Sequence, residues 1–457
     1  MGFIEQAAAI VGSAQVLTGS DMARYVDDPT GAYPSAPLCV VRPGSTQEVS
    51  DLMALAHGMD QVVVPVSGNT GVSGGTFNEG AVMLSVERMN AVREVNASAR
   101  TATVEAGVIL DRLRDAADDA GLVFPVVFGA RGSAMVGGIL STNAGGSNVL
   151  RYGNTRAQCL GIEVVLADGR VMDLMTALHK DNSGYDLRDL MIGAEGTLGI
   201  ITAAVMKLSP KPAHTVTAML APVSLDAALT VLNRLQAASG GAVEACEYMP
   251  RSYIERQLAQ IAGAREPFDV PHEVNVLVEL AGDAGLSELF EDVLGAALEE
   301  GLIADAVIAQ NDTQRAAMWE RRESAAEVTL ATTPALMGDI ALPVDRLSDF
   351  FTAMRDRLSK IEPKAQETCV AHLGDGNIHY VAYSEANDPD LKARLSEAME
   401  GLVADMRGSF SAEHGVGLYK LGSMERHKNP VALDVMRSIK TALDPKGILN
   451  PGKVIPA

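Results

Sequence analysis

Hydrophobic and polar positions follow two different periods along the chain, and each change of period marks a predicted element. Residues 38–66 begin and end with short apolar runs that predict strands, and the segment between them repeats its apolar positions at helical spacing. Ser45 or Thr46 is the expected N-cap of that helix. The pattern further predicts strands in VMLSVERM and TATVEAGV, a helix over 108–122 that Gly121 ends, and a hairpin at Ala167-Asp168-Gly169.

The second half of the chain has a different arrangement, and Pro210-Lys211-Pro212 predicts a boundary before it. Beyond this point strand-like segments alternate with helical ones. HTVTAMLA, VEACEYM and EVNVLVELA predict strands, and 224–239, 287–300 and 312–330 predict helices. Residues 369–383 then read as strand, tight turn and strand. This alternation is typical of an α+β domain or a layered α/β domain.

A glycine-rich run, GARGSAMVGGILSTNAGGSNVLRYG, extends from Gly129 to Gly153. Glycine costs about 1 kcal/mol relative to alanine at an interior helix position, so the run should form neither a stable helix nor a central strand. Its backbone N–H groups can approach an anion or a flat ring closely. The run is therefore either a cradle for a cofactor or a connector rich in loops.

Two further loops of small residues lie beside predicted strands, at Ser67–Gly75 and at Ile192–Gly199. Backbone donors in the first loop suit a phosphate, although a plain glycine turn is the alternative. The first loop also matches the G-x-S-x-G elbow of serine hydrolases at Gly71–Gly75, but Thr76–Gly80 opposes the helix that an elbow needs. Three such loops predict convergence on one extended ligand.

Composition narrows the classes of protein. With 457 residues, 47% apolar and 21% charged, the chain should form two or three globular domains. A net charge of −21 argues against nucleic acid or an anionic membrane as partner. We expect neither a signal peptide nor a transmembrane segment. The four cysteines contain no CxxC pair, which predicts free thiols and a cytoplasmic location.

The hairpin at 369–383 carries the second candidate chemistry. His372 and His379 lie symmetrically about its turn, so we expect cross-strand neighbours that form half of a metal site. Glu413 could be the third protein ligand, with His414 free to act as a base. The alternative is two histidines with a purely structural role. Three of only eight histidines gathered in two glycine-flanked motifs favour a site.

The motifs STNAGGSNVLRYG, KDNSGYDLRDLMIGAEGTLGIIT, HLGDGNIH, SAEHGVG and LNPGKV occur in this order. Together they resemble the vanillyl-alcohol oxidase/PCMH superfamily of FAD enzymes, in the group of D-lactate and D-2-hydroxyglutarate dehydrogenases. The resemblance implies an α+β fold in three parts. These are a PCMH-type FAD-binding domain of two subdomains over 1–210, an α/β cap domain for substrate and metal over 211–425, and a segment over 426–457 that returns to the flavin.

The resemblance implies FAD bound without a covalent link. The loop Gly68–Gly75 would hold the pyrophosphate, the run Gly129–Gly153 would lie along the cofactor, Gly196 and Ile200 would approach the adenine, and Asn450 the flavin. The implied FAD-binding residues are Pro65, Ser67, Gly68, Asn69, Thr70, Gly71, Gly74, Gly129, Ser133, Gly137, Gly138, Ser141, Asn143, Gly145, Gly146, Tyr152, Gly153, Glu195, Gly196, Gly199, Ile200 and Asn450.

The resemblance also implies that His372, His379 and Glu413 bind a divalent cation, commonly zinc. This cation would acidify the 2-hydroxyl of a 2-hydroxy acid, His414 would remove the proton, and the C2 hydrogen would pass to flavin N5. Arg322 matches an arginine that clamps a substrate carboxylate. Its alternative is an exposed helix cation paired with Glu323 or Glu327.

Three departures from the D-2-hydroxyglutarate dehydrogenase pattern affect the expected substrate. Met337 replaces a lysine, Ala326 a threonine and Val381 an asparagine. Because these losses leave a more apolar pocket, we expect a D-lactate-like substrate, with D-2-hydroxyglutarate as the alternative. The expected electron acceptor is a quinone, an electron-transfer flavoprotein or a cytochrome, and a homodimer is possible. A serine hydrolase and a non-enzymatic metal-binding protein are the rival classes.

Overall fold

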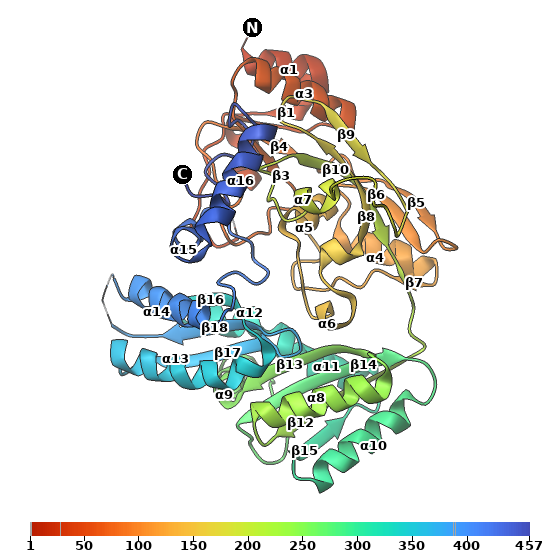
Figure 1. Cartoon of the computed structure of the whole chain (residues 1–457), viewed down its shortest axis with the longest axis vertical. Coiled ribbons are helices and arrows are strands. Elements are labelled where there is room, and N and C mark those ends of the chain that lie inside the picture. Colours follow the sequence, from red (N-terminus) through yellow and green to blue (C-terminus); the bar gives the residue numbers. More distant parts are fainter. Residues whose placement is uncertain (1, 28, 387, 389) are drawn as a thin grey trace. The chain divides into compact units, whose positions relative to one another are not determined.

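The computed structural model describes residues 2–27, 29–386, 388 and 390–457, and the chain forms two compact units (Figure 1). Unit 1 comprises Met1–Gly146, Gly153–Lys211 and Glu413–Ala457; unit 2 comprises Ser147–Tyr152 and Pro212–Ala412. The chain therefore passes from one unit to the other after residues 146, 152, 211 and 412. The division into functional domains at 210/211 and 425/426 stays a prediction.

The first sheet of unit 1 begins with the predicted βαβ segment. Its strand order is β1-β2-β4-β3, and β2 (Cys39–Val41), β4 (Val82–Ser85) and β3 (Val63–Val66) are parallel. Helix α3 (Thr46–Gly58) connects β2 to β3, and the Ser45 hydroxyl accepts a hydrogen bond from the Glu48 amide at 3.2 Å. The predicted strands, helix and N-cap are confirmed. Helix α1 (Phe3–Val11) packs against α3, and β1 (Val16–Leu17) is antiparallel to β2.

The second sheet of unit 1 is antiparallel, in the order β5-β6-β10-β8-β9. The strands are β5 (Val92–Asn96), β6 (Thr101–Glu105), β10 (Ile200–Lys207), β8 (Cys159–Val165) and β9 (Val171–Leu174). The hairpin predicted at Asp168-Gly169 joins β8 to β9, and Gly169 has φ +88°. Helix α4 (Leu110–Asp119) packs on this sheet, ending just before Gly121 as predicted. Further elements of the unit are α2 (Ala23–Val26), β7 (Leu122–Val123), α7 (Leu187–Met191), β11 (Ser209–Pro210), α15 (Leu421–His427) and α16 (Pro430–Leu443).

The glycine run contains two short helices, α5 (Val136–Thr142) and α6 (Val149–Tyr152), so the prediction that it forms no helix was wrong. The reason is close packing in α5. A Cβ atom at Gly137 would lie 2.9 Å from the Ala106 Cβ, and one at Gly138 would lie 3.2 Å from the Ser67 Cβ. Tertiary packing therefore outweighs the low helix propensity of glycine at these positions.

Unit 2 contains one antiparallel sheet in the order β15-β12-β14-β13-β17-β18-β16 (Figure 1). Its strands are β12 (His214–Pro222), β13 (Val243–Pro250), β14 (Val274–Gly282), β15 (Ile303–Ile308), β16 (Leu336–Ala341), β17 (Gln366–His372) and β18 (Asn377–Tyr383). Alternate residues of each strand point to opposite faces, so one face can pack on helices while the other carries a site.

The main core of unit 2 covers one face of this sheet. There α8 (Leu225–Ser239), α10 (Leu286–Glu299), α13 (Leu347–Ile361) and α14 (Leu391–Asp405) pack against the strands. The opposite face is covered by α9 (Arg251–Gln260), α11 (Asp312–Glu323) and α12 (Ala325–Leu330) around a smaller apolar cluster. The helix predicted over 312–330 is thus interrupted at Ser324, which caps α11.

The six residues 147–152 pack on unit 2 although both flanking segments belong to unit 1. Arg151 donates to the carboxylate of Glu244 at 2.9 Å, and the Tyr152 hydroxyl donates to the same carboxylate at 2.5 Å. A Cβ atom at Gly374 would lie 2.5 Å from a methyl carbon of Leu150, so the leucine packs closely on this turn. Charge pairing and close packing therefore hold this short segment against the sheet.

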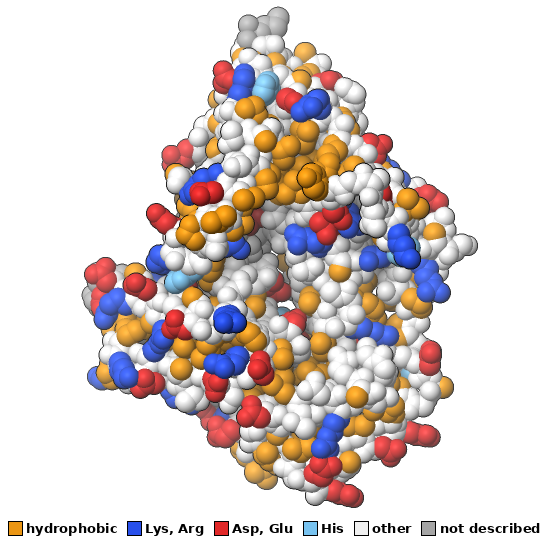
Figure 2. Space-filling view, viewed as in Figure 1, with side chains coloured by type: hydrophobic (Ala, Val, Ile, Leu, Met, Phe, Trp, Pro, Cys, Tyr) orange, Lys and Arg blue, Asp and Glu red, His pale blue; other side chains and the backbone are white. Residues whose placement is uncertain are grey.

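Two sequence expectations about the whole chain can be compared with the structure. Within residues 2–27, 29–386, 388 and 390–457, no helix has the length and low charge that are needed to cross a bilayer. The four cysteines are buried free thiols, as predicted. Acidic and basic side chains are interspersed over the face that Figure 2 shows.

Candidate active site

In unit 1 the loop after β3 lies against the glycine run. A Cβ atom at Gly68 would lie 2.2 Å from the Ser133 carbonyl oxygen, so only glycine permits this approach. Within the part of the chain that the structure describes, the backbone N–H groups of residues 68–72 have no hydrogen-bond partner. A row of unpaired backbone donors is the arrangement that binds phosphate groups.

The third loop of small residues joins the other two. The Glu195 amide donates to the Ser141 carbonyl at 2.8 Å, which ties this loop to the glycine run. The Asn450 side-chain amide donates to the carbonyl oxygens of Glu195 at 2.9 Å and Gly75 at 3.1 Å. The Asn450 Oδ1 is buried and has no partner among the described residues. The three loops therefore meet, and they leave a buried acceptor that a ring N–H of a cofactor could use.

Glu195 also fixes the segment that carries His414. Its carboxylate accepts the backbone N–H groups of Val416 at 2.7 Å and Gly417 at 2.8 Å. Burial raises the pKa of Glu195, although these two hydrogen bonds oppose the shift. The Ser73 hydroxyl donates to the His414 carbonyl at 3.0 Å. The backbone around His414 is thus held by the loops expected to bind FAD.

The G-x-S-x-G match at Gly71–Gly75 does not form a nucleophile elbow. No helix follows Ser73 in the described chain, where the next element is the strand β4. Ser73 is 4% exposed, and its hydroxyl is engaged with the His414 carbonyl. An elbow instead exposes its serine at a turn from strand to helix. The serine hydrolase alternative therefore lacks its structural basis.

A glycine substitution in the first loop tests this packing. We expect Gly68→Ala to destabilise unit 1 by about 1–3 kcal/mol and to lower its FAD content, because the backbone must shift away from Ser133. Gly58→Ala is the matched control, since a Cβ atom there meets nothing within 4 Å and Gly58 lies at the end of α3, outside the loops expected to bind FAD. The flavin absorbance of each purified variant, measured per mole of protein together with its melting temperature, checks the prediction. Equal FAD occupancy in both variants would contradict it.

In unit 2 the hairpin β17–β18 brings His372 and His379 together. Its register pairs Val370 with His379 and His372 with Asn377, so the two histidines are diagonal neighbours and not directly opposed. The expectation of a symmetric pair was wrong by this shift, but both side chains lie on the same face. Their ring centroids are 5.6 Å apart at an interplanar angle of 78°. Two imidazoles at this separation can serve one cation.

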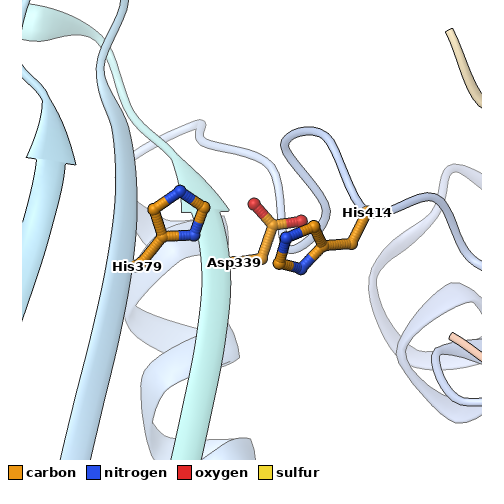
Figure 3. Close-up of side chains that lie close together, drawn as sticks. All are labelled: Asp339, His379 and His414. Carbon is orange, nitrogen blue, oxygen red and sulfur yellow. The ribbon is translucent and has the colours of Figure 1, made fainter. Parts of the chain in front are cut away.

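Asp339 is a third polar side chain on this face that the sequence did not single out. It lies on β16 directly opposite His379 in the register, and Figure 3 shows the two side chains on their strands. It is 5% exposed, and its Oδ1 accepts a hydrogen bond from the Asn377 side chain at 3.1 Å. An aspartate inside the apolar strand LMGDIA was the available signal, because a buried charge needs partners. His414, also drawn in Figure 3, belongs to unit 1.

Arg322 lies at the end of α11 and binds the buried carboxylate of Glu247. Its Nε donates to one carboxylate oxygen at 2.6 Å, and the other oxygen lies 2.8 Å from the His372 Nδ1. The Arg322 Nη2 is also 3.4 Å from the His372 Nε2. The Arg322 side chain is only 12% exposed, so the alternative of an exposed cation paired with Glu323 or Glu327 was wrong.

Glu247 is fully buried, and its charge state follows from its two partners. Burial alone raises the pKa of a carboxyl, but the charges and hydrogen bonds of His372 and Arg322 outweigh this and hold the pKa of Glu247 below its usual value. An ionised carboxylate only accepts hydrogen bonds, so the His372 Nδ1 is the donor. In the neutral imidazole the lone pair then lies on Nε2, which is the atom that can bind a metal.

Two of the three positions expected to set the substrate lie beside these histidines. Met337 pairs with Val381 in the register of β16 and β18, and Val381 is two residues beyond His379, so all three side chains lie on one face. Val381 is 4% exposed and Met337 is 48% exposed. Ala326 lies near the start of α12 and is exposed. This surface beside the histidines is therefore apolar where the family pattern has polar groups.

Comparison with known protein families gives two matches that together cover most of the chain. Residues 37–175 match the model of an FAD binding domain, and residues 211–454 match that of the C-terminal domain of FAD linked oxidases. The chain is 36% identical over 442 residues to the D-2-hydroxyglutarate dehydrogenase of Xanthomonas citri pv. viticola, covering 95% of this chain and 93% of that protein.

Two further relatives carry the same name. The chain is 32% identical to the D-2-hydroxyglutarate dehydrogenase of Stutzerimonas stutzeri, covering 99% of both proteins. It is 36% identical to the mitochondrial D-2-hydroxyglutarate dehydrogenase of Bos taurus, covering 91% of this chain and 76% of that protein.

Solved structures share the fold at low sequence identity. The structure of p-cresol methylhydroxylase with substrate bound matches with a TM-score of 0.77 and 15% identity, covering 99% of this chain and 96% of the other. Alkyldihydroxyacetonephosphate synthase matches with a TM-score of 0.75 and 18% identity, covering 99% of this chain and 86% of the other. The expected α+β fold, with an FAD-binding and a C-terminal domain, is confirmed.

Proposed function

Because the chain belongs to the FAD-linked oxidases and is an FAD-dependent oxidoreductase, we propose that it oxidises a D-2-hydroxy acid to the 2-oxo acid with the help of a divalent metal. The observation that carries the proposal lies in unit 2. There His372 and His379 share one sheet face, and Arg322 binds the same buried carboxylate as His372. A cation site beside an arginine suits a substrate that has a hydroxyl next to a carboxylate.

The proposed FAD site consists of the three loops of unit 1 that were expected to bind the cofactor. The unpaired N–H groups of residues 68–72 suit its pyrophosphate, and the buried Asn450 Oδ1 suits a ring N–H. Bound FAD would supply the acceptor for the hydrogen that leaves the substrate C2. The protein's own contribution is to hold the cofactor and to exclude competing groups from it.

The proposed metal ligands are His372, His379 and Glu413, and zinc is the first choice among divalent ions. Glu413 directly follows Ala412, whose backbone N–H donates to the Asp339 carbonyl at 3.3 Å. Asp339 pairs with His379 in the sheet. Because consecutive Cα atoms are about 3.8 Å apart, the backbone of Glu413 begins near this histidine. The two imidazoles and a carboxylate leave coordination positions for a substrate, and a bound cation would supply a Lewis acid.

In the proposed reaction the protein provides two groups that act on the substrate directly. Arg322 binds the C1 carboxylate. Glu247 holds its Nε, and because the guanidinium is planar, this contact also fixes the direction of the remaining N–H donors. His414 removes the proton from the 2-hydroxyl as the C2 hydrogen departs, which leaves the 2-oxo acid. The hydrogen bond from the Ser73 hydroxyl to the His414 carbonyl fixes the backbone that carries this base.

Met337, Val381 and Ala326 favour a substrate with a small or apolar tail, of which D-lactate is the simplest. D-2-hydroxyglutarate is the second candidate because the named relatives are D-2-hydroxyglutarate dehydrogenases. The test is the visible spectrum of the purified protein without oxygen, before and after adding each acid. Bleaching of the flavin band by D-lactate alone supports the first candidate, and rapid bleaching by D-2-hydroxyglutarate supports the second. No bleaching by either acid would refute the proposed reaction.

Substitution of Met337 tests which side chain selects the tail. We expect Met337→Lys to raise kcat/KM for D-2-hydroxyglutarate about 10- to 100-fold, since a charge-assisted hydrogen bond contributes about 1.5–3 kcal/mol. The value for D-lactate should change little. Met59→Lys is a matched control, because Met59 is 41% exposed and lies at the end of α3 in unit 1. A Met337→Lys enzyme with unchanged preference would show that the tail lies elsewhere.

The electron acceptor, the location and the oligomeric state remain predictions. A quinone, an electron-transfer flavoprotein or a cytochrome would take the electrons, and the cytoplasm and a homodimer are the expected setting. Steady-state assays with a soluble quinone and with ferricytochrome c distinguish a quinone acceptor from a cytochrome acceptor.

A further inference from the structure

Glu247 lies at the centre of the site in unit 2 although it would touch neither metal nor substrate. It belongs to β13, opposite His372 of β17 in the sheet register. Its two carboxylate oxygens have different partners, the Arg322 Nε at 2.6 Å and the His372 Nδ1 at 2.8 Å. The side chain is only 1% exposed, so water does not replace either hydrogen bond.

We infer that Glu247 is a positioning residue that holds the proposed metal ligand His372 and the proposed substrate-binding Arg322 in one rigid unit. This inference rests on the proposed function and names the residue that couples metal binding to carboxylate binding in it. A carboxylate bonded to Nδ1 fixes the ring orientation and leaves Nε2 for the cation. The same carboxylate compensates the charge of Arg322, which would otherwise be buried without a partner.

The backbone around Arg322 is held by separate contacts. The Tyr253 hydroxyl and the Gln257 side chain donate to the Arg321 carbonyl, at 2.7 and 3.1 Å. These bonds fix the end of α11 but not the direction of the Arg322 guanidinium. Glu247 supplies that direction, since it is the carboxylate that receives the Nε. Loss of Glu247 should therefore change the side chain of Arg322 and not the fold of the helix.

The sheet offers a matched control for this inference. Glu279 on the neighbouring strand β14 is 3% exposed and also binds α11, through Arg315 at 2.6 Å and Trp319 at 2.8 Å. Its hydrogen bonds go to Thr217, Arg315 and Trp319, so it serves as a carboxylate with a structural role. Glu247→Gln and Glu279→Gln each neutralise one buried carboxylate that binds the same helix. Only the first change should reach the metal and the substrate.

The experiment measures Zn²⁺ affinity by competition with a chromophoric chelator, using the full-length protein with FAD bound. We expect Glu247→Gln to weaken Zn²⁺ binding about 10- to 100-fold. KM for the acid that reduces the wild-type flavin should rise more than kcat falls, because Arg322 acts in binding. Glu279→Gln should keep Zn²⁺ affinity within about twofold of the wild type while lowering the melting temperature.

A second variant covers the case in which Glu247→Gln folds poorly. Glu247→Asp keeps the charge but withdraws the carboxylate by one methylene, so it should restore the melting temperature and bind Zn²⁺ with intermediate affinity. Wild-type affinity and KM in both Glu247 variants would overturn the inference and leave the proposed function intact. A wild-type protein that binds no Zn²⁺ would contradict the metal part of the proposed function, and the role of Glu247 would fall with it.

Discussion

Replacing His414 by alanine is expected to slow reduction of the bound flavin by a D-2-hydroxy acid by about 10²- to 10⁴-fold. The substitution removes the group that takes the hydroxyl proton. It leaves the contact with the FAD loops, because Ser73 donates to the His414 backbone carbonyl and not to its ring. FAD content and the visible spectrum should therefore match those of the wild type. Rapid mixing with substrate in the absence of oxygen measures the rate of bleaching.

His179→Ala is the control for this prediction. His179 is exposed, lies between β9 and α7, and is not among the expected site residues. Its variant should reduce at the wild-type rate. A His414→Ala enzyme that bleaches within twofold of the wild-type rate would show that another group is the base.

Removing the divalent metal is the second change with a large expected effect. Dialysis against a chelator should lower the rate of flavin reduction by about 10²- to 10³-fold, since a Lewis acid contributes several kcal/mol to the transition state. The flavin spectrum should persist, because the loops expected to hold FAD belong to unit 1 and the two histidines to unit 2. Metal analysis before and after dialysis and the rate after adding back Zn²⁺ or Mn²⁺ complete the measurement.

Two variants separate loss of the metal from loss of a histidine. His379→Ala should resist reactivation by added metal, while His214→Ala, at the exposed start of β12, should be reactivated fully. If the chelated wild-type protein were reduced as fast as the untreated one, the histidine pair would have a structural role, which is the alternative that the sequence left open.

Elements whose cause is local could be predicted from the sequence. The Ser45 cap depends on one hydroxyl and one nearby amide, and the hairpin at Asp168-Gly169 depends on a residue with positive φ. The FAD-linked fold followed from motifs that are themselves continuous in the chain. The helix within the glycine run could not be predicted in this way. Its glycines are tolerated only because Ala106 and Ser67 approach them, and those neighbours are 31 and 71 residues away.

The candidate site shows the same difference between residues with local signals and residues whose partners are distant in the sequence. His372 and His379 were found because they lie seven positions apart on either side of one predicted turn, and Arg322 because it matched a family pattern. Glu247 was missed because its partners are 75 and 125 residues away. The strand VEACEYM contained a signal, since Glu244 and Glu247 lie among apolar residues of one predicted strand. With helices expected on the sheet, at least one of the two glutamates had to be buried with a partner.

The six residues 147–152 set a condition for exchanging parts between relatives. Unit 2 is assembled from two stretches of sequence, and the shorter one supplies Arg151 and Tyr152 to the buried Glu244. A chimera that carries residues 212–412 into another FAD-linked oxidase would import Glu244 but leave its partners behind. The graft would then depend on whatever the host has at the corresponding turn. Unit 2 is therefore transplanted as two pieces, one of them within the loop expected to cradle the cofactor.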